Sequence, residues 1–166
     1  MKRIESAAEL YAHAIAIERE AAERYTEFSQ RMLDLGNEAV AAVFATLARF
    51  ETEHLIALER RTEGVALPQL AGHQYRWLDA GAPETAAREL IFRLMTPYDA
   101  LRIALRAETR AHAFFTQVLI TTGDPALRAL AREMAADEAE HIAMVERLLD
   151  EVPDPVVDWE SHYQER

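Results

Sequence analysis

The sequence predicts an all-α protein, an antiparallel four-helix bundle with a long crossover between its second and third helices. Composition favours helices, because half of the 166 residues are apolar while only five are glycine and six are proline. Apolar residues recur at helical spacing in four long segments, and a capping residue precedes each segment. We therefore expect one bundle domain over residues 1–152, with the crossover at about 65–95 and a tail over 153–166.

The first two predicted helices have clear start and stop signals. Ser6-Ala-Ala-Glu9 is typical of a capping box. In this motif the Ser6 hydroxyl accepts a hydrogen bond from the backbone amide of Glu9, and the Glu9 carboxylate accepts one from the backbone amide of Ser6. Helical spacing of apolar residues then continues to Gly36, and glycine is a common residue just after a helix. Asn37 can cap the second helix, which is expected to run to Gly64.

The crossover and the second helix pair follow. Helical spacing lapses over residues 65–82, a stretch too long for a hairpin between antiparallel neighbours, and a short helix is expected within 83–95. Thr96-Pro97 and Asp124-Pro125 each place a cap residue before a proline at the first helical position. These signals predict a third helix toward Gly123 and a fourth helix that two prolines end soon after residue 150. The tail is expected to pack on the bundle or on a neighbouring subunit.

Charge and composition exclude several classes of function. The formal net charge of −11 gives no electrostatic attraction for nucleic acid and would repel an anionic membrane surface. The chain has no cysteine, which excludes disulfides, thiolate metal ligands and a cysteine nucleophile. No apolar run approaches the length of a membrane span or of a signal sequence. We therefore expect a soluble cytoplasmic protein with no nucleic-acid or membrane partner.

Two Glu-x-x-His motifs carry the chemistry of the sequence. Glu138 and His141 are three residues apart, so on an α-helix they project from adjacent positions of one face, and that face is otherwise apolar. Glu51 and His54 repeat this arrangement on the second predicted helix. One such pair alone is weak evidence for a site, because chance would give roughly one Glu-x-x-His in a chain of this composition.

The two halves of the chain match in order. Glu18 lies 33 residues before Glu51, and Glu108 lies 30 residues before Glu138. This pattern indicates an internal duplication of helix pairs, with one inward carboxylate on each of two helices and Glu-x-x-His on each of the others. That arrangement is the ligand set of dimetal carboxylate bundles. The six candidate metal ligands are Glu18, Glu51, His54, Glu108, Glu138 and His141.

The residue types indicate which metals would bind. Carboxylates and imidazoles without thiolates suit Fe(II) or Mn(II) and leave coordination positions for water, peroxide or dioxygen. Glu51 and Glu138 are the expected bridging carboxylates, at the ~3.5–4 Å metal separation usual for two-metal sites. The four negative charges of four glutamates balance the four positive charges of two divalent cations. Without metal the carboxylates would repel one another in an apolar core, so we expect some to bind protons and the metal to stabilise the fold.

Two further residues are candidates for catalytic roles beside the metals. Tyr25, on the helix of Glu18, is placed either to hydrogen-bond a ligand carboxylate or to pack in the core. His112 follows Glu108 by one turn on the same predicted face, where it is either a proton donor or a core-edge histidine bonded to a carbonyl. The sequence leaves both alternatives open.

Four segments resemble the rubrerythrin branch of the ferritin-like superfamily, over about residues 5–150. They are Glu18 to Tyr25, Glu51-Thr-Glu-His54, Thr96 to Glu108, and Asp137-Glu-Ala-Glu-His141. The resemblance implies a four-helix bundle with a di-iron centre, which in rubrerythrins reduces hydrogen peroxide to water with electrons from a rubredoxin-type iron site. Carried over position by position, it implies the same six metal ligands.

The chain departs from the rubrerythrin pattern at two points. Rubrerythrins usually carry a rubredoxin domain held by cysteine pairs, so a chain without cysteine implies a separate electron-donor protein. Rubrerythrins also carry an additional glutamate one turn past the ligand of the third helix, where this chain has Ala111. The leading hypothesis is a di-iron oxidoreductase that reduces hydrogen peroxide or dioxygen in oxidative-stress defence.

Alternatives to this function stay open. The six ligands resemble the ferroxidase centres of ferritins and bacterioferritins equally well, which would imply a ferroxidase for iron storage. A non-catalytic carrier or sensor of iron or manganese would use the same ligands. We expect a homodimer, and the crossover is long enough for helix pairs to exchange between chains, so that each site would combine residues of two chains.

Overall fold

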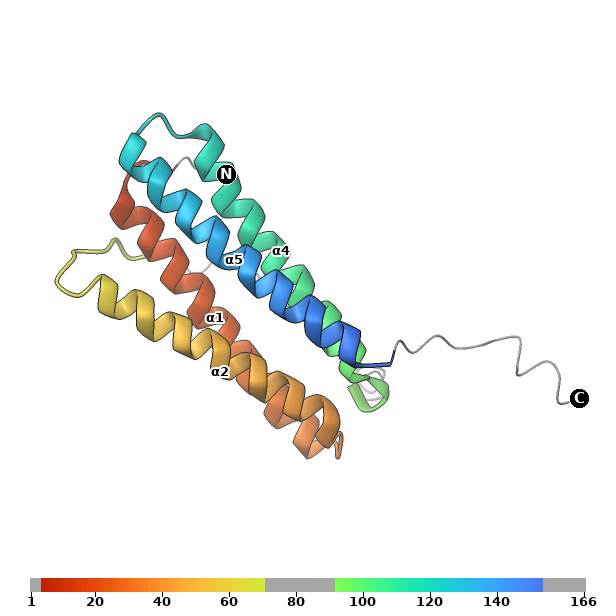
Figure 1. The fold of residues 1–166 in the computed structure, drawn as a ribbon. Helices are drawn as coiled ribbons and strands as arrows, with labels where there is room; N and C mark the ends of the chain where they lie inside the picture. Colours follow the sequence, from red (N-terminus) through yellow and green to blue (C-terminus); the bar gives the residue numbers. More distant parts are fainter. Residues whose placement is uncertain (1–3, 71–91, 154–166) are drawn as a thin grey trace, which may run out of the picture.

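The protein is a bundle of four long antiparallel helices, seen in a computed structural model that describes residues 4–70 and 92–153 (Figure 1). The helices are α1 (Ala7–Asp34), α2 (Glu38–Arg61), α4 (Pro97–Thr121) and α5 (Pro125–Glu151). The predicted all-α bundle is confirmed. The expected short helix at 83–95 lies largely outside the described residues, and so does the tail from 154. No helix in the described part is long and apolar enough to span a membrane.

The helix starts follow the capping residues that the sequence indicated. Thr96 forms a full capping box with Asp99, since its hydroxyl accepts from the Asp99 amide at 3.2 Å and the Asp99 carboxylate accepts from the Thr96 amide at 2.9 Å. Ser6 accepts from the Glu9 amide at 3.1 Å. The Glu9 carboxylate, however, accepts from the amide of Glu5 at 3.0 Å, one residue earlier than a capping box requires.

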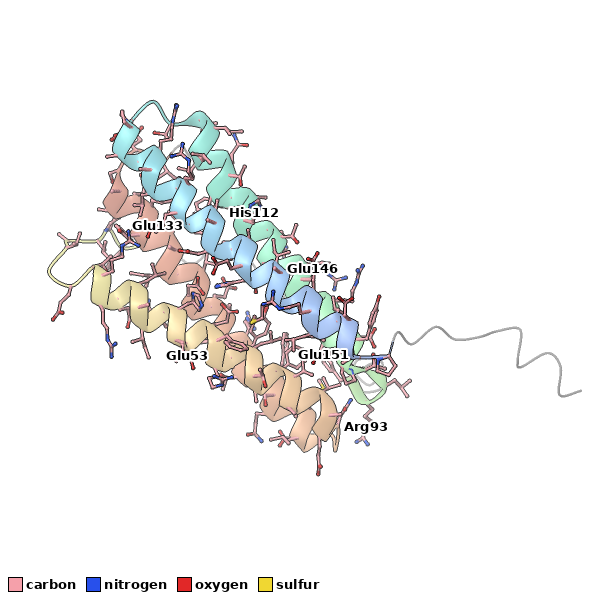
Figure 2. The ribbon with its side chains drawn as sticks, viewed as in Figure 1. Glu53, Arg93, His112, Glu133, Glu146 and Glu151 are labelled. Atoms are coloured by element: carbon pink, nitrogen blue, oxygen red, sulfur yellow. The ribbon has the colours of Figure 1, made fainter. Side chains whose placement is uncertain are left out.

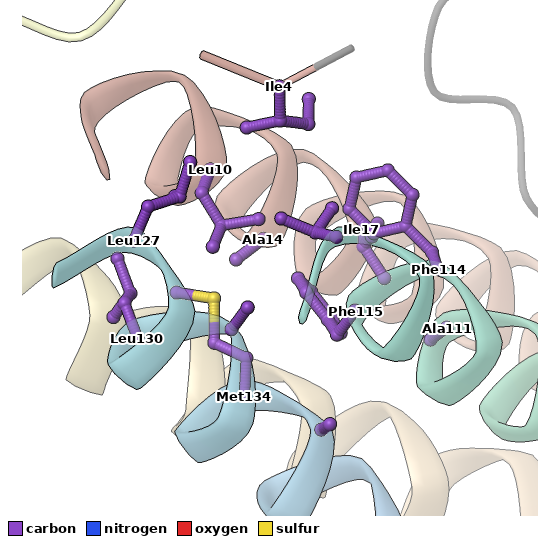
Figure 3. Packing of buried hydrophobic residues seen from close by; sticks show 13 residues of the cluster. Ile4, Leu10, Ala14, Ile17, Ala111, Phe114, Phe115, Leu127, Leu130 and Met134 are labelled. Carbon is purple, nitrogen blue, oxygen red and sulfur yellow. The ribbon is translucent and has the colours of Figure 1, made fainter. Parts of the chain in front are cut away.

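Two apolar clusters fill the bundle on either side of the predicted ligands. The first, the Phe115 cluster, is shown in Figure 3 and includes Leu10, Ile17, Ala111, Phe114, Leu127 and Met134. The second, the Phe44 cluster, includes Tyr25, Met32, Leu47, Ala107 and Val145. On α1 the two clusters meet at Glu18, which lies between Ile17 and Tyr25. The predicted ligands therefore occupy a polar layer between two apolar ones.

The helices form two hairpins that lie side by side. α1 packs chiefly against α2 and α4 chiefly against α5, as Figure 1 shows. The turn between α1 and α2 contains Gly36, whose φ of 75° lies in the left-handed region that glycine adopts without strain. Asn37 ends this turn and joins the hairpins. Its Oδ1 accepts from the Val40 amide at 3.3 Å, and its Nδ2 donates to the Met95 carbonyl at 2.8 Å.

We predict that Asn37→Ala lowers the free energy of unfolding of the metal-free protein by about 1–2 kcal/mol, because α2 loses its cap and the Met95 carbonyl loses its donor. Urea denaturation followed by circular dichroism measures the change. Asn37→Asp is the matched control, because aspartate keeps the cap but cannot donate to the carbonyl, and it should lose less. An unchanged stability in Asn37→Ala would contradict this role.

Candidate metal centre

All six predicted ligands meet between the two apolar clusters, within a single chain. Two groups of their ligand atoms lie within 4.8 Å of one another: Glu18 with His54 and His141, and Glu51 with Glu108 and His141. The sixth residue, Glu138, approaches His141 Nδ1 to 3.6 Å through its Oε2. A cavity of about 20 Å³ lies between the four carboxylates. Exchange of helix pairs between chains stays a prediction.

The helices place these side chains inward at one level. α1 contributes Glu18 and α4 contributes Glu108, while α2 and α5 each contribute a Glu-x-x-His pair. Five of the six are buried, with exposed fractions of 3–6%; they are Glu18, Glu51, Glu108, Glu138 and His141. Glutamate is almost never fully buried unless a partner compensates its charge. Four of them in one layer therefore indicate a site that holds cations.

The two histidines contact each other as well as the carboxylates. His141 Nδ1 lies 3.3 Å from Glu108 Oε2, and His141 Nε2 lies 3.1 Å from Nδ1 of His54. The two rings are nearly perpendicular, at 85°. Both nitrogens of His141 thus face other predicted ligands. A histidine that binds metal through one nitrogen commonly contacts a carboxylate through the other. His141 fits this pattern, because its Nδ1 faces the Glu108 carboxylate while its Nε2 faces another predicted ligand, His54.

Burial keeps several of the carboxyls protonated when no metal is bound. Burial raises the pKa of Glu18 to about 8 and, with the charges of Glu108 and Glu51, the pKa of Glu138 to about 10. The pKa of Glu51 is also well above its usual range, again chiefly through burial. The charges of neighbouring carboxyls add to the raised pKa of Glu51 and of Glu138. Because a protonated carboxyl carries no charge, protons take the place of cations here.

The two imidazoles are shifted in opposite directions. Burial lowers the pKa of His54, and the neighbouring His141 lowers it further. Burial also acts to lower the pKa of His141, but its hydrogen bond to Glu108 and the charges of Glu108 and Glu51 raise it overall. His54 is therefore neutral at physiological pH, which is the form that binds metal.

Tyr25 lies beside this centre with its ring in the Phe44 cluster. The side chain is fully buried and stacks on Phe44 with ring centroids 6.0 Å apart. Its hydroxyl has no hydrogen-bond partner among the described residues. Burial and the charges of Glu108, Glu51 and Glu18 raise its pKa well above the usual value, so the hydroxyl stays protonated. A buried donor without a partner beside four carboxylates fits a hydrogen bond to a ligand carboxylate.

His112 is not brought to the centre in the same way. The side chain is half-buried on α4 (Figure 2), and it lines neither the cavity between the carboxylates nor the one next to it. On this helix Ala111, three residues after Glu108, takes the inward position instead. A catalytic role for His112 stays a prediction.

Sequence reasoning missed a second cavity, which lies against the centre and is lined by residues of α1, α2, α4 and α5. It has a volume of about 120 Å³, and its lining includes the ligands Glu18, His54 and Glu138 together with Arg61 and Asp137. The sequence held one signal for two of these lining residues, namely their spacing from the predicted ligands. Arg61 follows His54 by seven residues, and Asp137 precedes His141 by four, so both share a helix face with a ligand. Which residues of different helices enclose a cavity cannot be read from spacing.

The residues present fit a pair of divalent metal ions. Carboxylate oxygens and imidazole nitrogens are the donors that iron(II) and manganese(II) take in bundles of this kind. Four carboxylates match the charge of two such ions, which would replace the protons of the metal-free site. The unpartnered Tyr25 hydroxyl fits as a donor to a carboxylate that is charged once metal is bound.

We predict that the metal-free protein loses stability as the pH rises above neutrality. The pKa of Glu18 increases from 4.5 to about 8 on folding, so its stabilising proton is fully present below about 4.5 and is lost as the pH rises through about 8. Between about pH 6 and 9, this residue alone should lower the free energy of unfolding by about 3 kcal/mol. Urea denaturation at the two pH values measures it. Glu18→Gln should lose less, and an equal loss would contradict the assignment.

Comparison with known proteins places this centre among related ones. A model of the rubrerythrin family matches residues 9–73. The crystal structure of an uncharacterized conserved protein from Magnetospirillum magnetotacticum MS-1 is 36% identical, covers 92% of this chain and 99% of its own, and superposes with a TM-score of 0.72. No curated protein matches the chain. The chain therefore belongs to the rubrerythrin-like family of the ferritin-like superfamily.

Proposed function

We propose that this protein is a di-iron oxidoreductase that reduces hydrogen peroxide, or dioxygen, in defence against oxidative stress. The observation that carries the proposal is the meeting of four buried carboxylates and two imidazoles from four helices at one level of the bundle. Membership of the rubrerythrin-like family supports iron as the metal, with manganese as the alternative that the same donors accept.

The six predicted ligands would hold two metal ions in different roles. Glu51 and Glu138, both buried in the layer, stay the predicted bridging carboxylates, and His54 and His141 would supply the nitrogen donors. When bound, two iron(II) ions supply one electron each, and with two protons these convert one hydrogen peroxide to two water molecules. With metal bound, the Tyr25 hydroxyl would donate a hydrogen bond to a charged ligand carboxylate, and the apolar clusters on either side would exclude water from most of the layer.

The electrons come from a separate protein in this proposal. The chain contains no cysteine, so it cannot hold a rubredoxin-type iron site of its own. Association as a homodimer also stays a prediction. The same holds for an exchange of helix pairs between two chains.

We predict that Glu51→Ala and His141→Ala each reduce bound iron from two ions per chain to one or none, because each removes a buried donor. Plasma mass spectrometry on anaerobically loaded protein measures the metal content. Glu53→Ala and His112→Ala are the matched controls, an exposed carboxylate on α2 and a half-buried imidazole on α4, and both should keep two ions. Equal metal content in all four variants would contradict the assigned ligands.

The reaction itself is tested by mixing the iron(II)-loaded protein with peroxide or with oxygen in a stopped-flow spectrophotometer. We expect a fast absorbance change that peroxide drives faster than oxygen, and continued peroxide consumption when a reductant is added. Faster oxidation by oxygen, with accumulation of ferric mineral, would instead assign a ferroxidase. Stable iron binding with no reaction toward either oxidant would leave a metal carrier.

A further inference from the structure

Metal ions need a path to ligands that are buried in the bundle. The second cavity offers one, and we call it the α2–α5 cavity. At its inner end are the ligands Glu18, His54 and Glu138, while Ala57 and Asp137 at its outer end are exposed. Its volume of about 120 Å³ has room for about four water molecules at ~30 Å³ each. A partly hydrated divalent ion fits in this space.

We propose that the α2–α5 cavity is the route by which divalent metal ions reach the centre, and that Asp137 receives the ion at its mouth. This inference rests on the proposed function, because it requires metal at the six ligands. Much of the cavity wall is apolar, and it includes Ala14, Leu58, Phe115 and Met134. A cation can pass such a wall only where oxygen or nitrogen donors replace its waters.

The charges at the mouth favour a cation over an anion. Arg61 also lines the cavity, but both of its terminal nitrogens bind Glu133 of α5, with Nη2 donating to Oε2 at 2.8 Å. Its guanidinium also lies over the Tyr11 ring, 5.5 Å from the centroid. Arg61 is thus fixed in place, with its charge matched by Glu133. The side chain of Asp137 forms no hydrogen bond or ion pair with any other residue that the structure describes, so its carboxylate is available to a cation.

The position of Asp137 also suits a stepwise transfer of the metal ion from the cavity mouth to the ligands. It precedes the ligand Glu138 in the chain, and it lines the same cavity as His54. An ion held by Asp137 at the mouth therefore lies on the same cavity wall as the ligands it must reach next. Carboxylates that line a cleft raise the local concentration of cations and their association rate.

The test measures uptake of cobalt(II), whose visible absorption reports binding, by the full-length metal-free protein. Asp137→Asn should slow uptake roughly tenfold, because the focusing charge is lost. Ala57→Phe should slow it through obstruction, with no change of charge. The matched controls are Glu146→Gln, an exposed carboxylate on α5, and Ala45→Phe, an exposed alanine on α2, and both should stay within about twofold of the wild type.

The number of cobalt ions bound at equilibrium distinguishes residues that line the route from residues that hold the metal. Both variants should still bind two cobalt ions per chain, and release to a chelator should slow together with uptake, because entry and exit share one path. Uptake at the wild-type rate by Asp137→Asn and Ala57→Phe would overturn the route while leaving the metal centre intact. If Asp137→Asn bound one cobalt ion fewer per chain, Asp137 would be a metal ligand, and its proposed role on the route would be overturned. Failure of the wild type to bind cobalt would overturn the centre itself.

Discussion

Four glutamates buried at one level of an apolar bundle are the constraint on which the rest of this structure depends. Their charges repel one another in a place where water cannot screen them, so the layer requires compensation. Without metal, protons supply it, because burial raises the pKa of Glu18 to about 8 and that of Glu138 to about 10. Divalent ions would supply it more fully, and the fold and its metal are then coupled: whatever binds the carboxylates also stabilises the bundle.

The helices must hold this layer in register, and local signals at their ends do so. Caps and prolines fix where α2, α4 and α5 begin, and those starting points decide which residue of each helix reaches the level of the centre. The apolar clusters on either side then offset the cost of the polar layer by burying large side chains such as Phe44 and Phe115. Asn37 contributes to both tasks, as a cap and as a link between hairpins.

Sequence alone could predict the helices and the meeting of the six candidate ligands, because both depend on spacing within a helix and on the repeat between the two halves. The helix that follows Thr96-Pro97 begins where its signal lies, and Glu51 and His54 share the face that their spacing of three requires. What lies between helices was harder to predict. His112 and Ala111 both flank Glu108 on α4, and only packing decided that the alanine points inward. The α2–α5 cavity is lined by residues of all four helices and has no signature in the sequence of any single one.

The structure also breaks the symmetry of the duplicated sequence. Tyr25 and Phe115 occupy equivalent places, seven residues after Glu18 and Glu108, yet they differ by one hydroxyl. The Tyr25 hydroxyl is buried and has no hydrogen-bond partner among the described residues, whereas Phe115 lines the α2–α5 cavity together with His54. His54 is also less buried than its counterpart His141. One side of the centre is therefore enclosed and carries a hydrogen-bond donor, while the other is open to a cavity, so the two metal positions that the repeat predicts would differ chemically.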